Sequence, residues 1–192
     1  MKKRDIPNLI SILRILLVGP TVYLLVNEQY AIALGLFFIA GISDVTDGFL
    51  ARYFGWQSRL GAILDPLGDK LLMVSCFLAL GWLGQVPILL VTLVIARDLI
   101  IVIGAISYHV LIEEVSIEPV RISKLNTAMQ ILLVIIIIFA NTQLPLSHLL
   151  QESILDILIY AVYATTILSG VVYVWMWGQR ARQVNNDRNV DE

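Results

Sequence analysis

The sequence predicts an all-α integral membrane protein with six transmembrane helices and both termini in the cytoplasm. Composition, the length of the apolar stretches and the placement of basic residues support this prediction. Of the 192 residues, 58% are apolar and 15% are charged, and the mean hydropathy is +0.84. Soluble globular domains are typically about half apolar and a quarter charged. The composition therefore excludes a water-soluble domain, a disordered chain and, with Cys76 as the single cysteine, a secreted disulfide scaffold.

Six apolar stretches are long enough to cross a bilayer, which takes about 20 mostly apolar residues in a helix. Runs such as residues 131–139 do not alternate between apolar and polar side chains, as strands of membrane barrels do, so helices are predicted. The predicted spans cover residues 8–26, 30–51, 61–82, 86–111, 125–143 and 153–177. Together they form one membrane domain over residues 1–178, followed by a polar cytoplasmic tail over 179–192 that we expect to fray.

The basic residues favour one orientation of these spans. Lysine and arginine lie before the first span and after the second, fourth and sixth, whereas the connectors on the opposite side carry none. Because cytoplasmic loops of membrane proteins are enriched in these residues, the basic side is predicted to be cytoplasmic. We expect a bacterial inner membrane, since no organelle-targeting segment precedes the first span. The formal charge of −2 gives no indication of nucleic-acid binding.

Four carboxylates lie where a transmembrane helix should be apolar. Asp44 and Asp47 lie near the end of the second predicted span, and Asp65 and Asp69 near the start of the third. Helical residues three or four apart share a face, so each pair lies on one side of its helix, toward the cytoplasm. A carboxylate at the bilayer centre costs about 2.5–3.5 kcal/mol, and four together repel one another. One or two hard divalent cations remove both problems, because such ions prefer oxygen ligands.

Small and basic residues accompany the four acids. The small ones, which let helix backbones approach and leave room for an anionic ligand, are Gly48, Ala51, Gly61 and Gly68. Arg52 and Lys70 suit phosphate oxygens. The alternative interpretation is that the acids form structural ion pairs with Arg52, Arg59 and Lys70. Four intramembrane acids at helical spacing favour a functional site over this interpretation.

This stretch resembles the signature of the CDP-alcohol phosphatidyltransferase family, D-x2-D-G-x2-A-R-x8-G-x3-D-x3-D. Its eight fixed positions are met by Asp44, Asp47, Gly48, Ala51, Arg52, Gly61, Asp65 and Asp69. The resemblance implies a membrane enzyme in which the four aspartates hold two divalent ions, Mg2+ or Mn2+, at the diphosphate of CDP-diacylglycerol. It implies that Asp69 deprotonates the acceptor hydroxyl, that CMP leaves, and that the protein is a homodimer. The residues implied to contact the CDP-lipid are Gly48, Arg52, Ser58 and Gly61.

A second stretch, residues 121–130, bears on the acceptor. Phosphatidylglycerophosphate synthases of bacteria show G-K-x-K-T there, whereas this chain has Ser123 for the glycine and Asn126 for the second lysine. A phosphomonoester carries up to two charges and rewards two cations, so the loss of one favours a singly charged phosphodiester such as phosphatidylglycerol. The pattern S-K-x-N-T-A-x-Q is instead similar to the CMP-forming cardiolipin synthases within the family. Transfer to glycerol 3-phosphate stays open as the alternative.

Three basic residues are predicted to lie near the acceptor phosphate: Arg97, Arg121 and Lys124. Arg97 and Asp98 lie in the middle third of the fourth span, where charges are costly. Direct pairing between them is expected to be poor, because neighbours on a helix point about 100° apart. Arg14, in the first span, is expected either to line the nucleotide site or to extend to the lipid headgroups.

Two other function classes can be weighed against an enzyme. In a cation transporter the carboxylates would line a pathway, and polar residues should continue into the far half of the spans. Residues 71–83 and 31–39 are nearly all apolar, and the chain shows no repeated halves. A non-catalytic assembly protein would leave four intramembrane acids without a reason. The sequence therefore predicts an enzyme of phospholipid biosynthesis.

Overall fold

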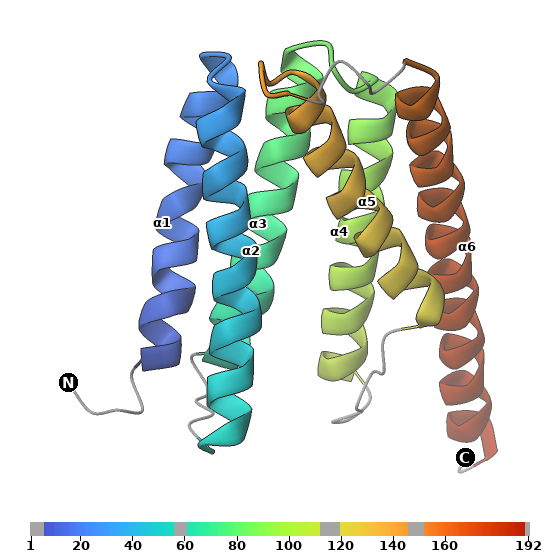
Figure 1. Cartoon of the computed structure of the whole chain (residues 1–192). Coiled ribbons are helices and arrows are strands. Elements are labelled where there is room, and N and C mark those ends of the chain that lie inside the picture. The colour runs from blue at the N-terminus through green and yellow to red at the C-terminus, as the bar shows by residue number, and fades with distance from the viewer. Residues whose placement is uncertain (1–5, 56–60, 112–119, 146–151, 191–192) are drawn as a thin grey trace. The chain divides into compact units, whose positions relative to one another are not determined.

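The computed structural model describes residues 6–55, 61–111, 120–145 and 152–190 (Figure 1). Side chains are described for residues 9–44, 46, 53–55, 67–104, 120–145 and 153–179. Six helices are present in these ranges: α1 (Ile6–Val26), α2 (Tyr30–Tyr53), α3 (Gly61–Trp82), α4 (Ile88–Leu111), α5 (Arg121–Ala140) and α6 (Glu152–Val190). The predicted all-helical fold with six helices is confirmed.

Helices α1 and α3 end with the same hydrogen-bonded cap. At the end of α3, Gly84 adopts a positive φ of 72°, and the amides of Gly84 and Gln85 donate to the carbonyls of Gly81 (3.1 Å) and Leu80 (2.9 Å). This is the Schellman arrangement, in which a left-handed residue turns the chain back over the last helical turn. Glu28 has the same role after α1, with a φ of 59°, although it is not a glycine. A tight reversal therefore joins α1 to α2, and the same cap ends α3.

The helix ends differ from the predicted ones mainly in the last two helices. Helix α5 begins at Arg121 instead of residue 125, and α6 continues to Val190, far beyond the predicted end at residue 177. The expectation that the tail frays is wrong. Its residues are polar, but glutamine, arginine and alanine favour the helix, and no glycine or proline follows Gly178. The polar residues after Gly178 end the membrane-spanning part of α6, but the helix itself continues.

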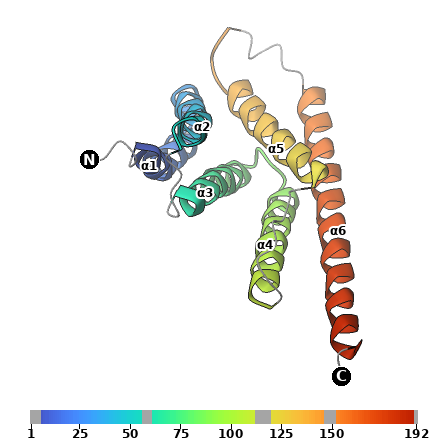
Figure 2. The same cartoon turned by 90° about the horizontal axis from the view of Figure 1, so that it is seen from below.

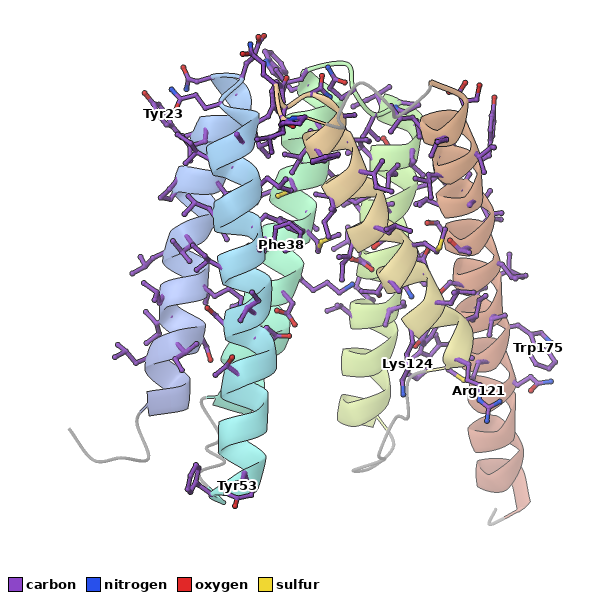
Figure 3. All side chains as sticks on the ribbon, viewed as in Figure 1. Tyr23, Phe38, Tyr53, Arg121, Lys124 and Trp175 are labelled. Atoms are coloured by element: carbon purple, nitrogen blue, oxygen red, sulfur yellow. The ribbon has the colours of Figure 1, made fainter. Side chains whose placement is uncertain are left out.

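The helices have the length and surface of membrane spans. Among the described residues, three segments are long and apolar enough to cross a bilayer: Leu9–Val26, Arg121–Ala140 and Ser153–Gln179. Helices α2, α3 and α4 have 24, 22 and 24 residues, which is sufficient length at about 1.5 Å per residue. Large apolar side chains such as Leu16, Tyr23 and Trp175 are 65%, 67% and 64% exposed. Tyr23 and Trp175 point outward in Figure 3. Such a surface fits lipid rather than water.

The chain packs as two compact units. The first consists of Met1–Pro87 with Val134–Glu152, and the second of Ile88–Leu133 with Ser153–Glu192, so that α5 contributes to both. In the first unit α1 packs against both α2 and α3 (Figure 2). Its buried apolar residues include Leu25, Phe37, Cys76, Phe77 and Leu80. Those of the second unit include Leu90, Val94, Leu133, Val162 and Tyr173.

Candidate active site

The acids of the signature lie on α2 and α3 at one end of the first unit. Asp44 lies nine residues before the end of α2, and Asp69 eight residues after the start of α3. Arg14 lies eight residues after the start of α1. Because consecutive helices of this unit run in opposite directions, these three positions lie at the same end (Figure 1). At 1.5 Å per residue they lie about 12–14 Å along their helices from that end.

A single arginine side chain joins the acids of the two helices. Arg14 Nη1 lies 2.6 Å from Asp44 Oδ1 and also forms an ion pair with Asp69 Oδ1. The Arg14 side chain is 1% exposed, whereas those of Asp44 and Asp69 are 38% and 48% exposed. We name this arrangement of Arg14, Asp44 and Asp69 the Arg14 bridge. Of the two alternatives for Arg14, extension to the lipid headgroups is wrong, because the side chain is buried.

Gly68 lies against the Arg14 side chain. A Cβ at position 68 would lie 3.4 Å from Ile15 Cγ1 and 3.6 Å from Arg14 Cδ. Both distances are ordinary van der Waals contacts, so a small residue fits here, and the helix that lies against this part of α3 is α1. The Arg14 side chain thus lies along α3 at Gly68, and its guanidinium contacts the carboxylates of Asp44 and Asp69.

The donor chemistry of the Arg14 bridge fits a divalent metal ion. Two carboxylates from different helices converge on one positive group and retain exposed surface, and oxygen donors of this kind suit Mg2+ and Mn2+. Within the described residues, no group of three or more His, Cys, Asp or Glu side chains comes together. At the six remaining signature positions the structure describes the backbone alone, namely at Asp47, Gly48, Ala51, Arg52, Gly61 and Asp65. Ser58 lies wholly outside the described residues.

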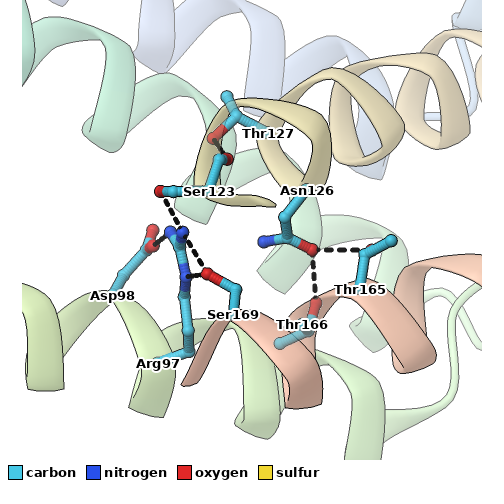
Figure 4. Close-up of polar contacts among 8 residues, drawn as sticks. All are labelled: Arg97, Asp98, Ser123, Asn126, Thr127, Thr165, Thr166 and Ser169. Atoms are coloured by element: carbon cyan, nitrogen blue, oxygen red, sulfur yellow. Dashed lines mark hydrogen bonds and ion pairs between the residues drawn. The ribbon is translucent and has the colours of Figure 1, made fainter. Parts of the chain in front are cut away.

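The second unit holds a buried polar group around Arg97 (Figure 4). Arg97 is 4% exposed, and its Nη1 lies 2.7 Å from Asp98 Oδ1. Arg97 Nε and Nη2 donate to Ser169 Oγ of α6 at 3.1 and 2.8 Å, and Nη2 also donates to Ser123 Oγ of α5. The Tyr173 ring lies under the guanidinium, with 5.8 Å between its centre and Arg97 Cζ. We name these five residues the Arg97 group.

The Arg97 group corrects one sequence prediction. Pairing between Arg97 and Asp98 was expected to be poor, yet the two side chains form a close ion pair. The arginine side chain is long enough to bend toward its neighbour. The formal charges of Arg97 and Asp98 therefore cancel within the membrane-spanning part of the chain.

A second polar group lies one helical turn further along α5. Asn126 is fully buried, and its Oδ1 accepts hydrogen bonds from the hydroxyls of Thr165 and Thr166, both at 2.9 Å. Lys124 and Arg121 lie at the start of α5 with exposed side chains (Figure 3). Of the three predicted acceptor residues, only Arg97 thus belongs to a buried polar group among the described residues.

Comparison with known proteins defines the class of this chain. Residues 4–177 match the CDP-alcohol phosphatidyltransferase family, and the chain belongs to it. Members of this family are integral membrane proteins, as the composition predicted.

The curated relatives fall into two groups. The cardiolipin synthase (CMP-forming) of Homo sapiens is 33% identical over 95% of this chain and 64% of its own length. The chloroplastic CDP-diacylglycerol–glycerol-3-phosphate 3-phosphatidyltransferase 1 of Oryza sativa is 34% identical over 96% of this chain and 59% of its own. The CDP-diacylglycerol–glycerol-3-phosphate 3-phosphatidyltransferase of Rickettsia typhi is 28% identical over 88% and 95%. The chain spans less than two thirds of the length of the human and rice relatives.

Proposed function

We propose that this chain transfers the phosphatidyl group of CDP-diacylglycerol to phosphatidylglycerol, giving cardiolipin and CMP. The hydroxyl oxygen of phosphatidylglycerol forms a bond to the phosphatidyl phosphorus, and the bond from that phosphorus to the CMP oxygen breaks. The observation that carries this proposal is the Arg14 bridge, which brings together the first and last aspartates of the family signature from two helices. Membership of the family supports it.

The aspartates have two roles in this proposal. Asp44, Asp47, Asp65 and Asp69 hold the divalent ions, Mg2+ or Mn2+, which when bound neutralise the diphosphate and the departing CMP. Asp69 also accepts the proton of the acceptor hydroxyl, for which its 48% exposure leaves a carboxylate surface within reach. Because a charged group at this depth is costly against lipid, we expect that surface to face water or substrate.

The CDP-lipid and the acceptor are bound by other residues of the chain. We assign Gly48, Arg52, Ser58 and Gly61 to the CDP-lipid, since they surround the aspartates in the sequence. We assign Arg97, Arg121 and Lys124 to the acceptor. Both assignments are based on the positions of these residues in the sequence, and substitution of each residue tests them.

The charge of the Arg97 group favours phosphatidylglycerol as the acceptor. Arg97 is paired with Asp98 at 2.7 Å, so the buried group has no net formal charge. A phosphodiester carries one negative charge, whereas glycerol 3-phosphate carries up to two and gains more from additional cations. Asn126, where a second lysine would stand in the G-K-x-K-T pattern, is neutral and already bound to Thr165 and Thr166. Both features favour the less charged acceptor.

Phosphatidylglycerophosphate synthesis is the second candidate. It is favoured by the Rickettsia typhi relative, which this chain covers over 95% of its length, and by the two exposed cations at the start of α5, Arg121 and Lys124. These two cations would bind a phosphomonoester that does not reach the buried polar groups around Arg97 and Asn126. We further propose a bacterial inner membrane with the reaction on its cytoplasmic side, and a homodimer.

The acceptor assay separates the two candidates. Purified protein in mixed micelles is given CDP-diacylglycerol and Mn2+ with either phosphatidylglycerol or glycerol 3-phosphate, and the lipid products are separated by chromatography. Cardiolipin from the first acceptor, without phosphatidylglycerophosphate from the second, is the expected result. Product from glycerol 3-phosphate alone would contradict the proposed acceptor and support the second candidate.

A further inference from the structure

We propose that Arg14 is an internal counter-ion that competes with the divalent metal ion for Asp44 and Asp69. Its guanidinium then acts as a positioning residue: it holds the two metal ligands together until the metal replaces it. This inference rests on the proposed metal site, and its test is chosen so that the two can fail separately.

The geometry of the Arg14 bridge supports direct competition. One nitrogen, Arg14 Nη1, contacts Oδ1 of both Asp44 and Asp69, so the guanidinium occupies the position between the two carboxylates. A metal ion shared by these residues needs the same oxygen atoms or the same space. Arg14 is buried while both carboxylates are partly exposed, so an incoming ion meets carboxylate oxygen atoms before it meets the guanidinium.

The charges explain why such a counter-ion is useful. Two carboxylates from α2 and α3 repel each other when no cation lies between them, and at this depth the repulsion is poorly screened. Arg14 supplies one positive charge from α1, which packs against both helices. The first unit therefore stays assembled before metal binds. A divalent ion offers twice the charge at shorter range, so it displaces the guanidinium, whose planar fork then suits the phosphate oxygens of a bound diphosphate.

Manganese binding by an Arg14→Gln variant tests the competition. Free Mn2+ is measured by electron paramagnetic resonance in a titration of the purified full chain in detergent, and thermal unfolding is followed in EDTA and in saturating Mn2+. Without the competing guanidinium, we expect the Kd for Mn2+ to fall on the order of tenfold, comparable with the loss of two partly exposed charge pairs. We also expect the Tm in EDTA to fall by several degrees and the gain in Tm with Mn2+ to increase.

Lys70→Gln is the matched control, because it removes one positive charge next to Asp69 and leaves Arg14 in place. A general electrostatic effect would tighten Mn2+ binding equally in both variants, whereas competition predicts a change of less than about threefold for Lys70→Gln. An equal effect of the two substitutions would contradict the proposal, as would unchanged or weaker Mn2+ binding by Arg14→Gln.

Two further outcomes concern the metal site itself and the folding of the Arg14→Gln variant. If neither the unmodified chain nor either variant binds Mn2+, the proposed metal site itself is wrong. If Arg14→Gln does not fold in EDTA or in Mn2+, Arg14→Lys decides, because an ammonium on a shorter side chain bridges two carboxylates less well. Mn2+ binding about threefold tighter in Arg14→Lys would support competition, and unchanged or weaker binding would overturn it.

Discussion

Replacing Asp98 with asparagine tests whether the neutrality of the Arg97 group determines which acceptor is used. The substitution keeps the size and shape of the side chain and removes its negative charge. Arg97 and Asp98 are 4% and 10% exposed, so the remaining arginine charge stays buried among helices. The perturbation is thus confined to one charge at one place.

The structure allows the loss of stability to be estimated. Removing one partner of a buried ion pair costs about 3–5 kcal/mol. The asparagine oxygen can still accept from Arg97 Nη1, and Ser123 and Ser169 still accept from the guanidinium, so we expect a smaller loss of about 2–3 kcal/mol. For a chain of this size that corresponds to a Tm lower by roughly 5–10 °C, measured by thermal unfolding in detergent.

The effect on acceptor choice follows from the same charge. A phosphate about 6 Å from the unpaired guanidinium gains about 3 kcal/mol per negative charge at an effective dielectric constant of 20. Because glycerol 3-phosphate carries one charge more than phosphatidylglycerol, its use relative to phosphatidylglycerol should rise at least about tenfold. The assay is the ratio of kcat/KM for the two acceptors in mixed micelles.

Ser169→Ala is the matched control for this prediction. It removes an oxygen that accepts two hydrogen bonds from Arg97 and leaves the charge unchanged. We expect it to lower stability by about 1.5–3 kcal/mol without altering the acceptor ratio. An unchanged ratio in Asp98→Asn, or an equal change in Ser169→Ala, would refute the link between the Arg97 group and the acceptor.

The remaining predictions concern glycines and a helix cap, and all are measured as Tm changes in detergent. A Cβ at Gly104 would lie 2.6 Å from Trp177 Cε2, so Gly104→Ala should destabilise the protein by about 1–3 kcal/mol. A Cβ at Gly35 meets nothing within 4 Å, so Gly35→Ala should stabilise α2 by up to about 1 kcal/mol. Equal effects of the two would contradict the packing of α6 on α4. Gly84→Ala should cost about 1–2 kcal/mol because of its φ of 72°, and Glu28→Gly should stabilise its cap by up to about 1 kcal/mol. A stabilising Gly84→Ala would argue against the left-handed cap after α3.

The helices could be predicted from the sequence because the solvent is lipid. Backbone groups within a bilayer must be satisfied internally, which leaves helices and closed barrels, and a long apolar stretch without alternation fits only the helix. The start of α5 and the end of α6 differ most from the prediction. At both places polar residues continue the helix beyond the apolar stretch. Hydropathy locates the part of a helix that spans the membrane and is silent on the rest.

The candidate site could be predicted only in part. The four aspartates stand out because intramembrane acids are rare and lie at helical spacing. The pairing of Arg14 with Asp69 does not follow from the sequence, since 55 residues separate them and α1 has no other charged residue. A lone cation inside a span was the available signal, and a buried cation in a membrane needs a partner. The pairing of Arg97 with Asp98 was missed because helical angles alone ignore the reach of a long side chain.

The central claim is that the aspartates of the signature act through bound divalent metal during phosphatidyl transfer. It is tested most directly by the rate of CMP release from CDP-diacylglycerol, with phosphatidylglycerol present, before and after chelation with EDTA. We predict release that stops on chelation and returns when Mn2+ is added in excess. Release at an undiminished rate in EDTA would contradict the claim.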